Sequence, residues 1–166
     1  MGIGFTSLGC DYTGIDVDAQ SIEFAKTKGI DAHCLPVEEI CKCDQLNRKY
    51  DLIFSSNVFE HLSAPYAAFG ALGAICGGVI VIIVPNAKGL FARLKSSKSI
   101  RKVIRLITHS NTELAYSIDG RWHDMAYCKE TLRYLCEQTG LEPLKLSSMG
   151  INDPTFGFVQ HNQSLL

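Results

Sequence analysis

The sequence lacks a hydrophobic run long enough to cross a bilayer, and it lacks a signal peptide. The longest apolar stretch, GGVIVIIVP at residues 77–85, is far shorter than a transmembrane helix, which needs about 20 residues. The first residues, MGIGFTSLGCD, have neither a basic flank nor a long apolar core. These two absences predict a cytoplasmic protein.

The sequence also lacks a strong net charge and a paired cysteine pattern. Its 166 residues carry a formal net charge of -1, with 46% hydrophobic and 20% charged residues, as in one ordinary globular domain. The seven cysteines are an odd number, and most lie in apolar or helical patterns typical of buried free thiols. Cys41 and Cys43 have no second pair at zinc-site spacing, so no metal site is predicted.

Strand-like and helix-like segments alternate along the chain, which indicates an α/β layered fold in a single domain, residues 1–166. The strongest strand lies at 77–86, where six consecutive β-branched residues imply burial on both faces, as inside a parallel sheet. A helix is predicted at 19–28, with Asp18 as N-cap and Gly29 after its end. The other predicted strands are 12–15, 32–35, 50–57, 143–148 and 156–160, and the other helical segments are 37–41, 65–75 and 129–139.

Asp16 stands where the first of these strands stops and a helix pattern begins. Ligands of open parallel sheets bind beyond the carboxyl ends of the strands. A carboxylate at that place can accept hydrogen bonds from both ribose hydroxyls of a nucleoside cofactor. The alternative is that Asp16 or Asp18 simply caps the following helix. Both interpretations hold if Asp16 binds and Asp18 caps.

Polar segments follow three other predicted strands as well: LPVEE (35–39), SSNVFEHL (55–62) and PN (85–86). In order and spacing, the chain resembles class I methyltransferases that use S-adenosylmethionine (SAM). The residues that carry this resemblance are GIDVDAQSIEFAKTKGI, YDLIFSSNVFEHLSAP, GGVIVIIVPN and HDMAYCKETLRYLCEQTGLEPLKL, within roughly 9–148. The nearest likeness is to the ubiquinone-biosynthesis O-methyltransferase type.

The resemblance implies a Rossmann-like methyltransferase sheet, mostly parallel with an antiparallel C-terminal strand. It also implies in-line transfer of a methyl group from SAM to a small-molecule acceptor, at oxygen. Asp16 matches the ribose-binding acid of the family, and Val17 would pack against adenine. Val37 and Glu38 match the loop that frames the adenine ring. The segment beside the methionine part of SAM is matched by Ser55, Ser56 and Asn57.

The Glu60–His61 pair matches the pair at the active-site mouth of the family. His61 is the first candidate for a base, because an imidazole ordinarily titrates near pH 6.5. The alternative is a structural histidine that closes the loop, and Glu60 is expected to start a helix or to support a neighbouring group. His123 is a second candidate base. Some quinone-pathway relatives use a glutamate at the place of Asn57 to help bind a divalent metal. Because Asn57 is neutral, one carboxylate is missing here, and no metal site is predicted.

The resemblance fails at the first strand, which should end in a glycine-rich loop, G-x-G-x-G. Gly2 and Gly4 are candidates for a remnant of that loop; alternatively, GFTSLG (4–9) ends the next helix and the loop is absent. In either case the first strand is missing, which predicts two half-sheets with unpaired edges. We therefore expect an N-terminally truncated chain. A non-catalytic methyltransferase remnant is the alternative, and an NAD-type nucleotide-binding domain is a less favoured one.

A basic helical insertion is predicted at about 87–127. Lys88 to Arg105 includes seven basic residues and no acidic one. This stretch is either a cover helix with a solvated basic face or a surface for an anionic substrate or a membrane. Nucleic acid is not expected as a partner, because few aromatics interleave the basic residues. In the family such an insertion often helps to build the acceptor pocket, for which the candidates are Tyr116, Trp122, His123 and Tyr127.

Overall fold

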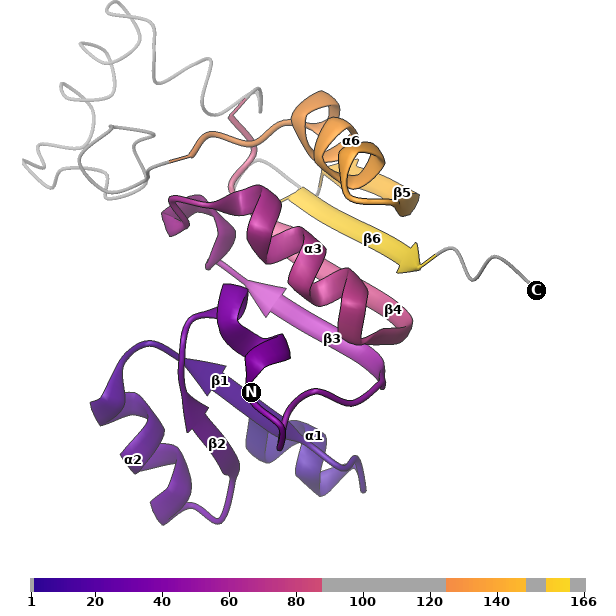
Figure 1. The fold of residues 1–166 in the computed structure, drawn as a ribbon. Coiled ribbons are helices and arrows are strands. Elements are labelled where there is room, and N and C mark those ends of the chain that lie inside the picture. The colour runs from indigo at the N-terminus through magenta and orange to yellow at the C-terminus, as the bar shows by residue number, and fades with distance from the viewer. Residues whose placement is uncertain (1, 88–124, 149–154, 162–166) are drawn as a thin grey trace, which may run out of the picture. The chain divides into compact units, whose positions relative to one another are not determined.

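The computed structural model describes residues 2–87, 125–148 and 155–161 (Figure 1). The predicted basic stretch Lys88 to Arg105 and the candidates Tyr116, Trp122 and His123 lie outside the described residues. The chain separates into two compact units, Met1–Arg48 and Lys49–Leu166. No helix within the described ranges is both long and apolar enough to span a bilayer.

The first unit contains a two-stranded parallel sheet, in which Asp16 stands opposite Cys34 at the carboxyl ends of the two strands. A helix connects these strands, as expected for parallel neighbours. The elements in chain order are α1 (Gly2–Ser7), β1 (Thr13–Asp16), α2 (Ala19–Thr27), β2 (Asp31–Cys34) and the 3-10 helix η1 (Val37–Lys42).

Helix α2 begins and ends as its sequence predicts. The Asp18 carboxylate accepts hydrogen bonds from the backbone N–H groups of Gln20 and Ser21 at 3.1 and 3.2 Å, so it caps the helix. Gly29 follows the last turn with a φ of 73°, a left-handed conformation that glycine adopts without a steric cost. Ile22 is the buried residue of this helix. Asp18 and Gly29 therefore set where helix α2 begins and ends, and Ile22 packs the helix against the rest of the unit.

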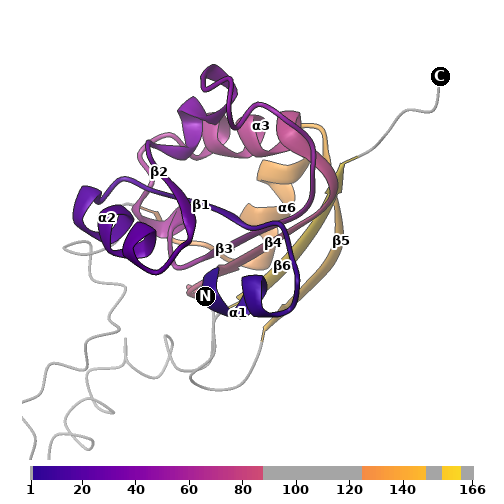
Figure 2. The same ribbon diagram turned by 90° about the horizontal axis from the view of Figure 1, so that it is seen from below.

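The second unit contains a four-stranded sheet in the order β3-β4-β6-β5. Strands β3 and β4 are parallel, and β6 is antiparallel to both β4 and β5. Figure 2 shows α3 and α6 on the same face of this sheet. The elements are β3 (Tyr50–Ser56), the 3-10 helix η2 (Phe59–His61), α3 (Pro65–Ile75), β4 (Cys76–Val84), α6 (Lys129–Gln138), β5 (Leu141–Ser148) and β6 (Thr155–His161).

The core of the second unit forms around β4, as its run of β-branched residues predicts. The five residues from Ile80 to Val84 are all buried. Helix α3 contributes Phe69 and Leu72 to the buried set, and the rings of Phe59 and Phe69 meet edge to face with centroids 4.9 Å apart. The turn η2, which carries Phe59, is therefore anchored in the core.

Strands β3 and β4 meet at an irregularity near their amino ends. The register shifts between Tyr50 and Leu52, and a Cβ atom at Gly78 would overlap the Asp51 carbonyl oxygen. The backbones approach too closely here for any side chain at this position. Glycine at residue 78 therefore permits the pairing of β3 with β4.

The structure has the two half-sheets that the sequence predicts. Within the described residues, β1 pairs with β2 alone and β3 pairs with β4 alone, so each is an edge strand. The prediction of an α/β fold with mostly parallel strands and an antiparallel C-terminal strand is confirmed.

Candidate functional site

Asp16 ends β1 with an exposed carboxylate. Its Oδ1 accepts a hydrogen bond from the Asp18 backbone N–H at 2.9 Å, which turns the chain into α2. Its Oδ2 has no hydrogen-bond partner in the described part of the chain, so this oxygen is available to a ligand hydroxyl. Asp18 meanwhile caps α2. The structure thus separates the two tasks, as the combined interpretation of the sequence requires.

The residues that follow β1 and β2 lie at the same edge of this small sheet, because the two strands are parallel. Val17, directly after Asp16, is 71% exposed. Its carbonyl accepts a hydrogen bond from the Cys34 thiol, with 3.6 Å between sulfur and oxygen. Val37 and Glu38 begin η1 after β2 and are half-buried. This edge therefore presents a carboxylate beside an exposed apolar side chain.

A hollow of about 250 Å³ lies in the first unit, among α1, α2 and one face of the sheet. Most of its lining is apolar, and Asp16 also borders it. The other lining residues are Gly2, Ile3, Tyr12, Gly14, Ile15, Ser21, Ile22, Phe24, Ala25, Lys28, Ile30 and Ala32.

Gly2 and Gly4 lie in helix α1 rather than in a loop. The Gly2 carbonyl accepts a hydrogen bond from the Thr6 hydroxyl at 3.0 Å, and the Gly4 carbonyl accepts one from the Leu8 N–H at 3.3 Å. Gly9, with a φ of 79°, follows the helix. The structure therefore has the alternative in which GFTSLG ends a helix.

In the second unit, Ser55 and Ser56 end β3, and Asn57 follows with a φ of 53°. Its N–H donates to the Ile83 carbonyl at 2.9 Å, and its side-chain amide donates to the Ser56 hydroxyl at 3.5 Å. A non-glycine residue with a positive φ is uncommon, and such residues cluster at functional sites. Sequence reasoning missed this conformation, although asparagine is among the residues that adopt it most readily.

Glu60 and His61 lie side by side on η2 in very different environments. The Glu60 side chain is 3% exposed, whereas that of His61 is 52% exposed. His61 Nε2 is 3.9 Å from Glu60 Oε1, an ion-pair distance too long for a hydrogen bond. The other oxygen, Oε2, is buried and accepts no hydrogen bond within the part of the chain that the structure describes. Burial of this acid was not predicted.

Tyr127 is buried, and its hydroxyl donates to the Phe59 carbonyl at 3.2 Å. Burial, and after it the negative charge of Glu60, raises the pKa of Tyr127 to about 12. The sequence predicted that Tyr127 lines an acceptor pocket. The structure instead gives its hydroxyl a partner inside the core, on the turn that carries Glu60 and His61.

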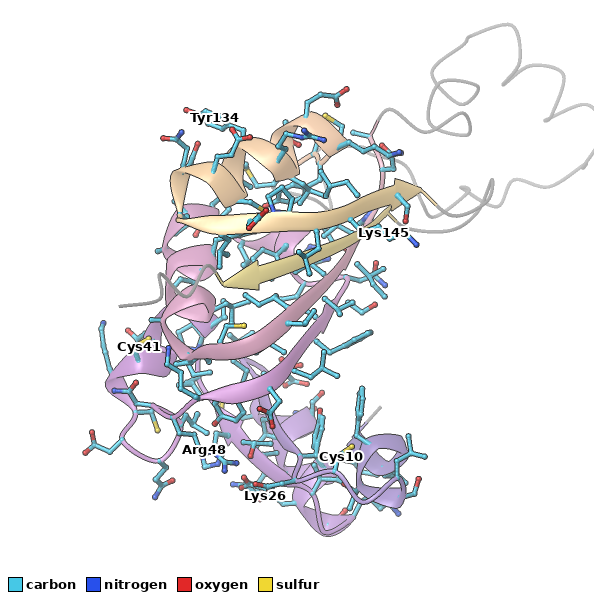
Figure 3. The ribbon with its side chains drawn as sticks, turned by 90° about the vertical axis from the view of Figure 1, so that its right-hand side faces the viewer. Cys10, Lys26, Cys41, Arg48, Tyr134 and Lys145 are labelled. Carbon is cyan, nitrogen blue, oxygen red and sulfur yellow. The ribbon has the colours of Figure 1, made fainter. Side chains whose placement is uncertain are left out.

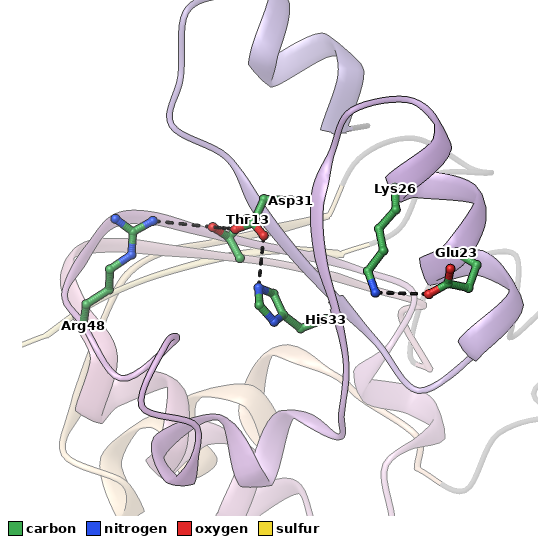
Figure 4. Close-up of polar contacts among 6 residues, drawn as sticks. All are labelled: Thr13, Glu23, Lys26, Asp31, His33 and Arg48. Carbon is green, nitrogen blue, oxygen red and sulfur yellow. Dashed lines mark hydrogen bonds and ion pairs between the residues drawn. The ribbon is translucent and has the colours of Figure 1, made fainter.

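The opposite edge of the first sheet has a polar network that the sequence did not predict (Figure 4). Asp31 Oδ2 accepts a hydrogen bond from the Thr13 hydroxyl at 2.8 Å, and Asp31 Oδ1 lies 3.1 Å from His33 Nε2. Arg48 donates to Thr13 and pairs with Asp11 at 3.0 Å. Thr13 and Asp31 begin their strands, so this network fastens the edge that lies away from Asp16.

All seven cysteines are free thiols, as predicted. Three are buried, but Cys10 is exposed and Cys41 is half-buried (Figure 3), so burial extends to fewer thiols than the sequence suggests. Among the described residues, no three His, Cys, Asp or Glu side chains are grouped as metal ligands would be.

A family model described as a methyltransferase domain matches residues 3–146. No curated protein sequence matches the chain. Among solved structures, the chain is similar to magnesium protoporphyrin IX methyltransferase from Synechocystis PCC 6803 with bound SAH. That similarity has 13% identity and a TM-score of 0.66, and it covers 97% of this chain and 68% of that one.

Two further structures show the same likeness. A SAM-dependent methyltransferase from Archaeoglobus fulgidus is 16% identical with a TM-score of 0.64, over 95% of this chain and 79% of that one. The 1,6-didemethyltoxoflavin-N1-methyltransferase from Burkholderia thailandensis is 12% identical with a TM-score of 0.62, over 96% of this chain and 64% of that one. At such identities the likeness establishes the fold, which is Rossmann-like.

Proposed function

The chain belongs to the class I SAM-dependent methyltransferase family, and on this premise we propose that it methylates a small-molecule acceptor at oxygen. The observation that carries the proposal is the exposed Asp16 carboxylate at the carboxyl end of a parallel strand. Two of the similar structures are named for small-molecule acceptors, magnesium protoporphyrin IX and 1,6-didemethyltoxoflavin. Within the family we propose the ubiquinone-biosynthesis type.

The residues at the Asp16 edge fit a nucleoside cofactor. Asp16 Oδ1 already accepts the Asp18 N–H, while Oδ2 is available for a ribose hydroxyl. Val17 offers an exposed apolar side chain for the adenine ring. In this proposal Val37 and Glu38 frame the adenine. The methionine part of SAM contacts Ser55, Ser56 and Asn57.

Gly2 and Gly4 stay candidates for cofactor contact in this proposal, although both lie in helix α1 rather than in a glycine-rich loop. His123 remains the second candidate base, outside the described residues.

His61 is the proposed base for the reaction. Bound SAM would supply the methyl group: the acceptor oxygen would bond the methyl carbon as the carbon–sulfur bond broke, with a neutral thioether as the leaving group. His61 accepts the proton of the acceptor hydroxyl on its imidazole. Because half of the His61 side chain is exposed, the ring can release that proton to solvent.

The test is calorimetric titration of the chain with SAM and with S-adenosylhomocysteine. Asp16→Asn keeps the size of the side chain and removes its charge. We expect a loss of affinity of about 10- to 100-fold, the effect of removing hydrogen bonds to a charged group. Asp44→Asn is the control, since Asp44 is an exposed aspartate in the same unit. Absence of SAM and S-adenosylhomocysteine binding in the parent chain would overturn the proposal.

A second candidate is a methyltransferase-like domain without catalytic activity. The helical placement of Gly2 and Gly4 favours it, because the family uses a glycine-rich loop beneath the cofactor. Within the described residues, β1 and β3 each have one strand neighbour. Absence of SAM binding in the calorimetric titration would support the non-catalytic domain, and saturation with NADH in place of SAM would support an NAD-type domain.

A further inference from the structure

We infer that Glu60 is a positioning residue for His61, and that Tyr127 holds the turn that carries both. This inference rests on the proposed function, in which His61 accepts the proton of the acceptor. Glu60 itself is not proposed to touch the acceptor or the cofactor, because its side chain is almost entirely buried.

The first observation is an unsatisfied buried acid. Glu60 Oε2 is buried and has no hydrogen-bond donor among the described residues, and Oε1 has His61 Nε2 at 3.9 Å. Leaving a buried carboxylate oxygen without a donor costs free energy, and a native structure that keeps such a group calls for an explanation. A partner that becomes positively charged during the reaction explains it. His61 is the titratable side chain that lies beside this acid on the same turn and is half exposed to solvent.

The second observation is how firmly the turn is held. The Phe59 carbonyl accepts the Tyr127 hydroxyl at 3.2 Å, and the Glu60 carbonyl accepts the Met125 N–H at 3.0 Å. Two successive carbonyls of η2 are therefore bound by one short segment, 125–127. That segment is itself fixed, because the Tyr127 carbonyl accepts the Ala87 N–H at 2.7 Å. With its backbone held at these points, the turn keeps Glu60 inward and His61 outward.

The Tyr127 hydroxyl stays a donor at every physiological pH. Burial raises the pKa of Tyr127 to about 12, and the negative charge of Glu60 acts in the same direction. A neutral phenol can donate to the Phe59 carbonyl, whereas a phenolate cannot. The Glu60 carboxylate and the Tyr127 phenol are thus buried together beneath the turn.

The chemical consequence concerns the proton. When the acceptor oxygen takes the methyl group, its hydroxyl proton passes to His61 and the ring becomes an imidazolium. A carboxylate 3.9 Å away attracts that charge and favours one orientation of the ring. After the reaction the imidazolium gives the proton to solvent.

The experiment observes the His61 ring directly and needs no acceptor. The chain is labelled with ¹⁵N-histidine, and the ring signals are assigned with His61→Gln. At one fixed pH, Glu60→Gln should shift the ¹⁵N ring signals of His61, because the carboxylate beside the ring loses its negative charge. Glu137→Gln, an exposed glutamate in the same unit, should leave the signals unchanged.

Tyr127→Phe is the second variant, and it tests the inference if Glu60→Gln does not fold. It keeps the buried ring and removes only the hydrogen bond to Phe59. We expect a second set of His61 ring signals or broadened ones, because the turn is less firmly held. Unchanged His61 signals in the folded Glu60→Gln or Tyr127→Phe variant would overturn the inference. SAM affinity is measured on the same samples, so failure of SAM binding with an intact ring response would count against the proposed function alone.

Discussion

Asp18 links the start of helix α2 to the pH of the solution. Hydrogen bonds from the Ser21 hydroxyl and from the Gln20 and Ser21 backbone N–H groups lower the pKa of Asp18 below its ordinary value of 3.8. A carboxylate whose pKa is lowered by folding stabilises the fold fully above its ordinary value, and this contribution is lost as the pH falls through the lower folded value. We therefore expect the urea unfolding midpoint to fall on acidification below about pH 4, and Asp18→Asn to weaken that fall.

Ser21→Ala tests the cause, because it removes the largest contribution to the lowered pKa and leaves the carboxylate in place. In this variant the acid loss of stability should be smaller than in the parent and should be complete nearer pH 3.8, because the folded pKa lies closer to the ordinary value. Asp44→Asn, elsewhere in the first unit, should follow the parent profile. Circular dichroism at a series of pH values gives the midpoints. Superimposable acid profiles for the parent and both cap variants would contradict the role of Asp18.

At the scale of single residues, the sequence predicts a residue's role when that role depends on residues close to it in the chain. Asp18 as a cap and Gly29 after the helix are such cases, and the structure confirms both. Burial of Glu60 and the Tyr127 hydroxyl bond to Phe59 were not predictable, because the tyrosine and the turn are 68 residues apart. The ribose-binding role of Asp16 stays a prediction, supported by its exposed carboxylate.

The pairing of β3 with β4 depends on glycine at residue 78, because any side chain there would clash with the backbone of β3. Gly78→Ala should destabilise the second unit by about 1–3 kcal/mol, because the new Cβ would overlap the Asp51 carbonyl oxygen. Gly70→Ala is the matched control in helix α3, where no heavy atom lies within 4 Å of the added Cβ. That substitution should stabilise by about 0.5–1 kcal/mol, since alanine favours a helix over glycine.

Chemical denaturation of the two variants measures both effects. The expected signs are opposite although both substitutions are glycine to alanine, which separates a steric effect from a general change in chain entropy. A stabilised or unchanged Gly78→Ala would mean that β3 and β4 do not approach as closely as the structure has them.

At the level of elements, hydrophobic periodicity and the positions of glycine and proline predict the bounds of helix α3 and strand β4 to within a few residues. For the residues of helix α1 the sequence allows either a remnant of a glycine loop or a helix, because two of the six residues are glycine, the weakest helix former after proline. Its sequence offers no apolar face, and none of its residues is buried. Strand β5 begins at Leu141, before the predicted start, because pairing with β6 extends it. Such pairing depends on a second strand, which the residues of β5 alone do not specify.

The whole chain should show two levels of stability. Strand β4 is paired on both sides and supplies buried residues from Ile80 to Val84, whereas β1 and β2 each have one neighbour in the described structure. Two-stranded sheets are marginal by themselves. We expect the backbone amides of β4 to exchange with deuterium on the order of 100-fold more slowly than those of β1 and β2, for a difference of about 3 kcal/mol in opening free energy.

Hydrogen exchange followed by mass spectrometry on peptides of each strand measures this difference. Peptides of η1 and the following loop up to Arg48 report on the rest of the first unit, and peptides of α3 serve as an internal reference for the second. Equal protection of β1, β2 and β4 would show that the chain opens as one cooperative body, contrary to the expectation.

The hydrogen bond from Ala87 to Tyr127 has a consequence for how this protein can evolve. It joins two residues that are far apart in the sequence. Loop-closure entropy grows slowly, by about 0.6 kcal/mol for each doubling of length. Changes in the length of the chain between residues 87 and 127 should therefore cost little folding free energy, provided that Tyr127 keeps its hydrogen bonds and so holds the turn with His61 in place.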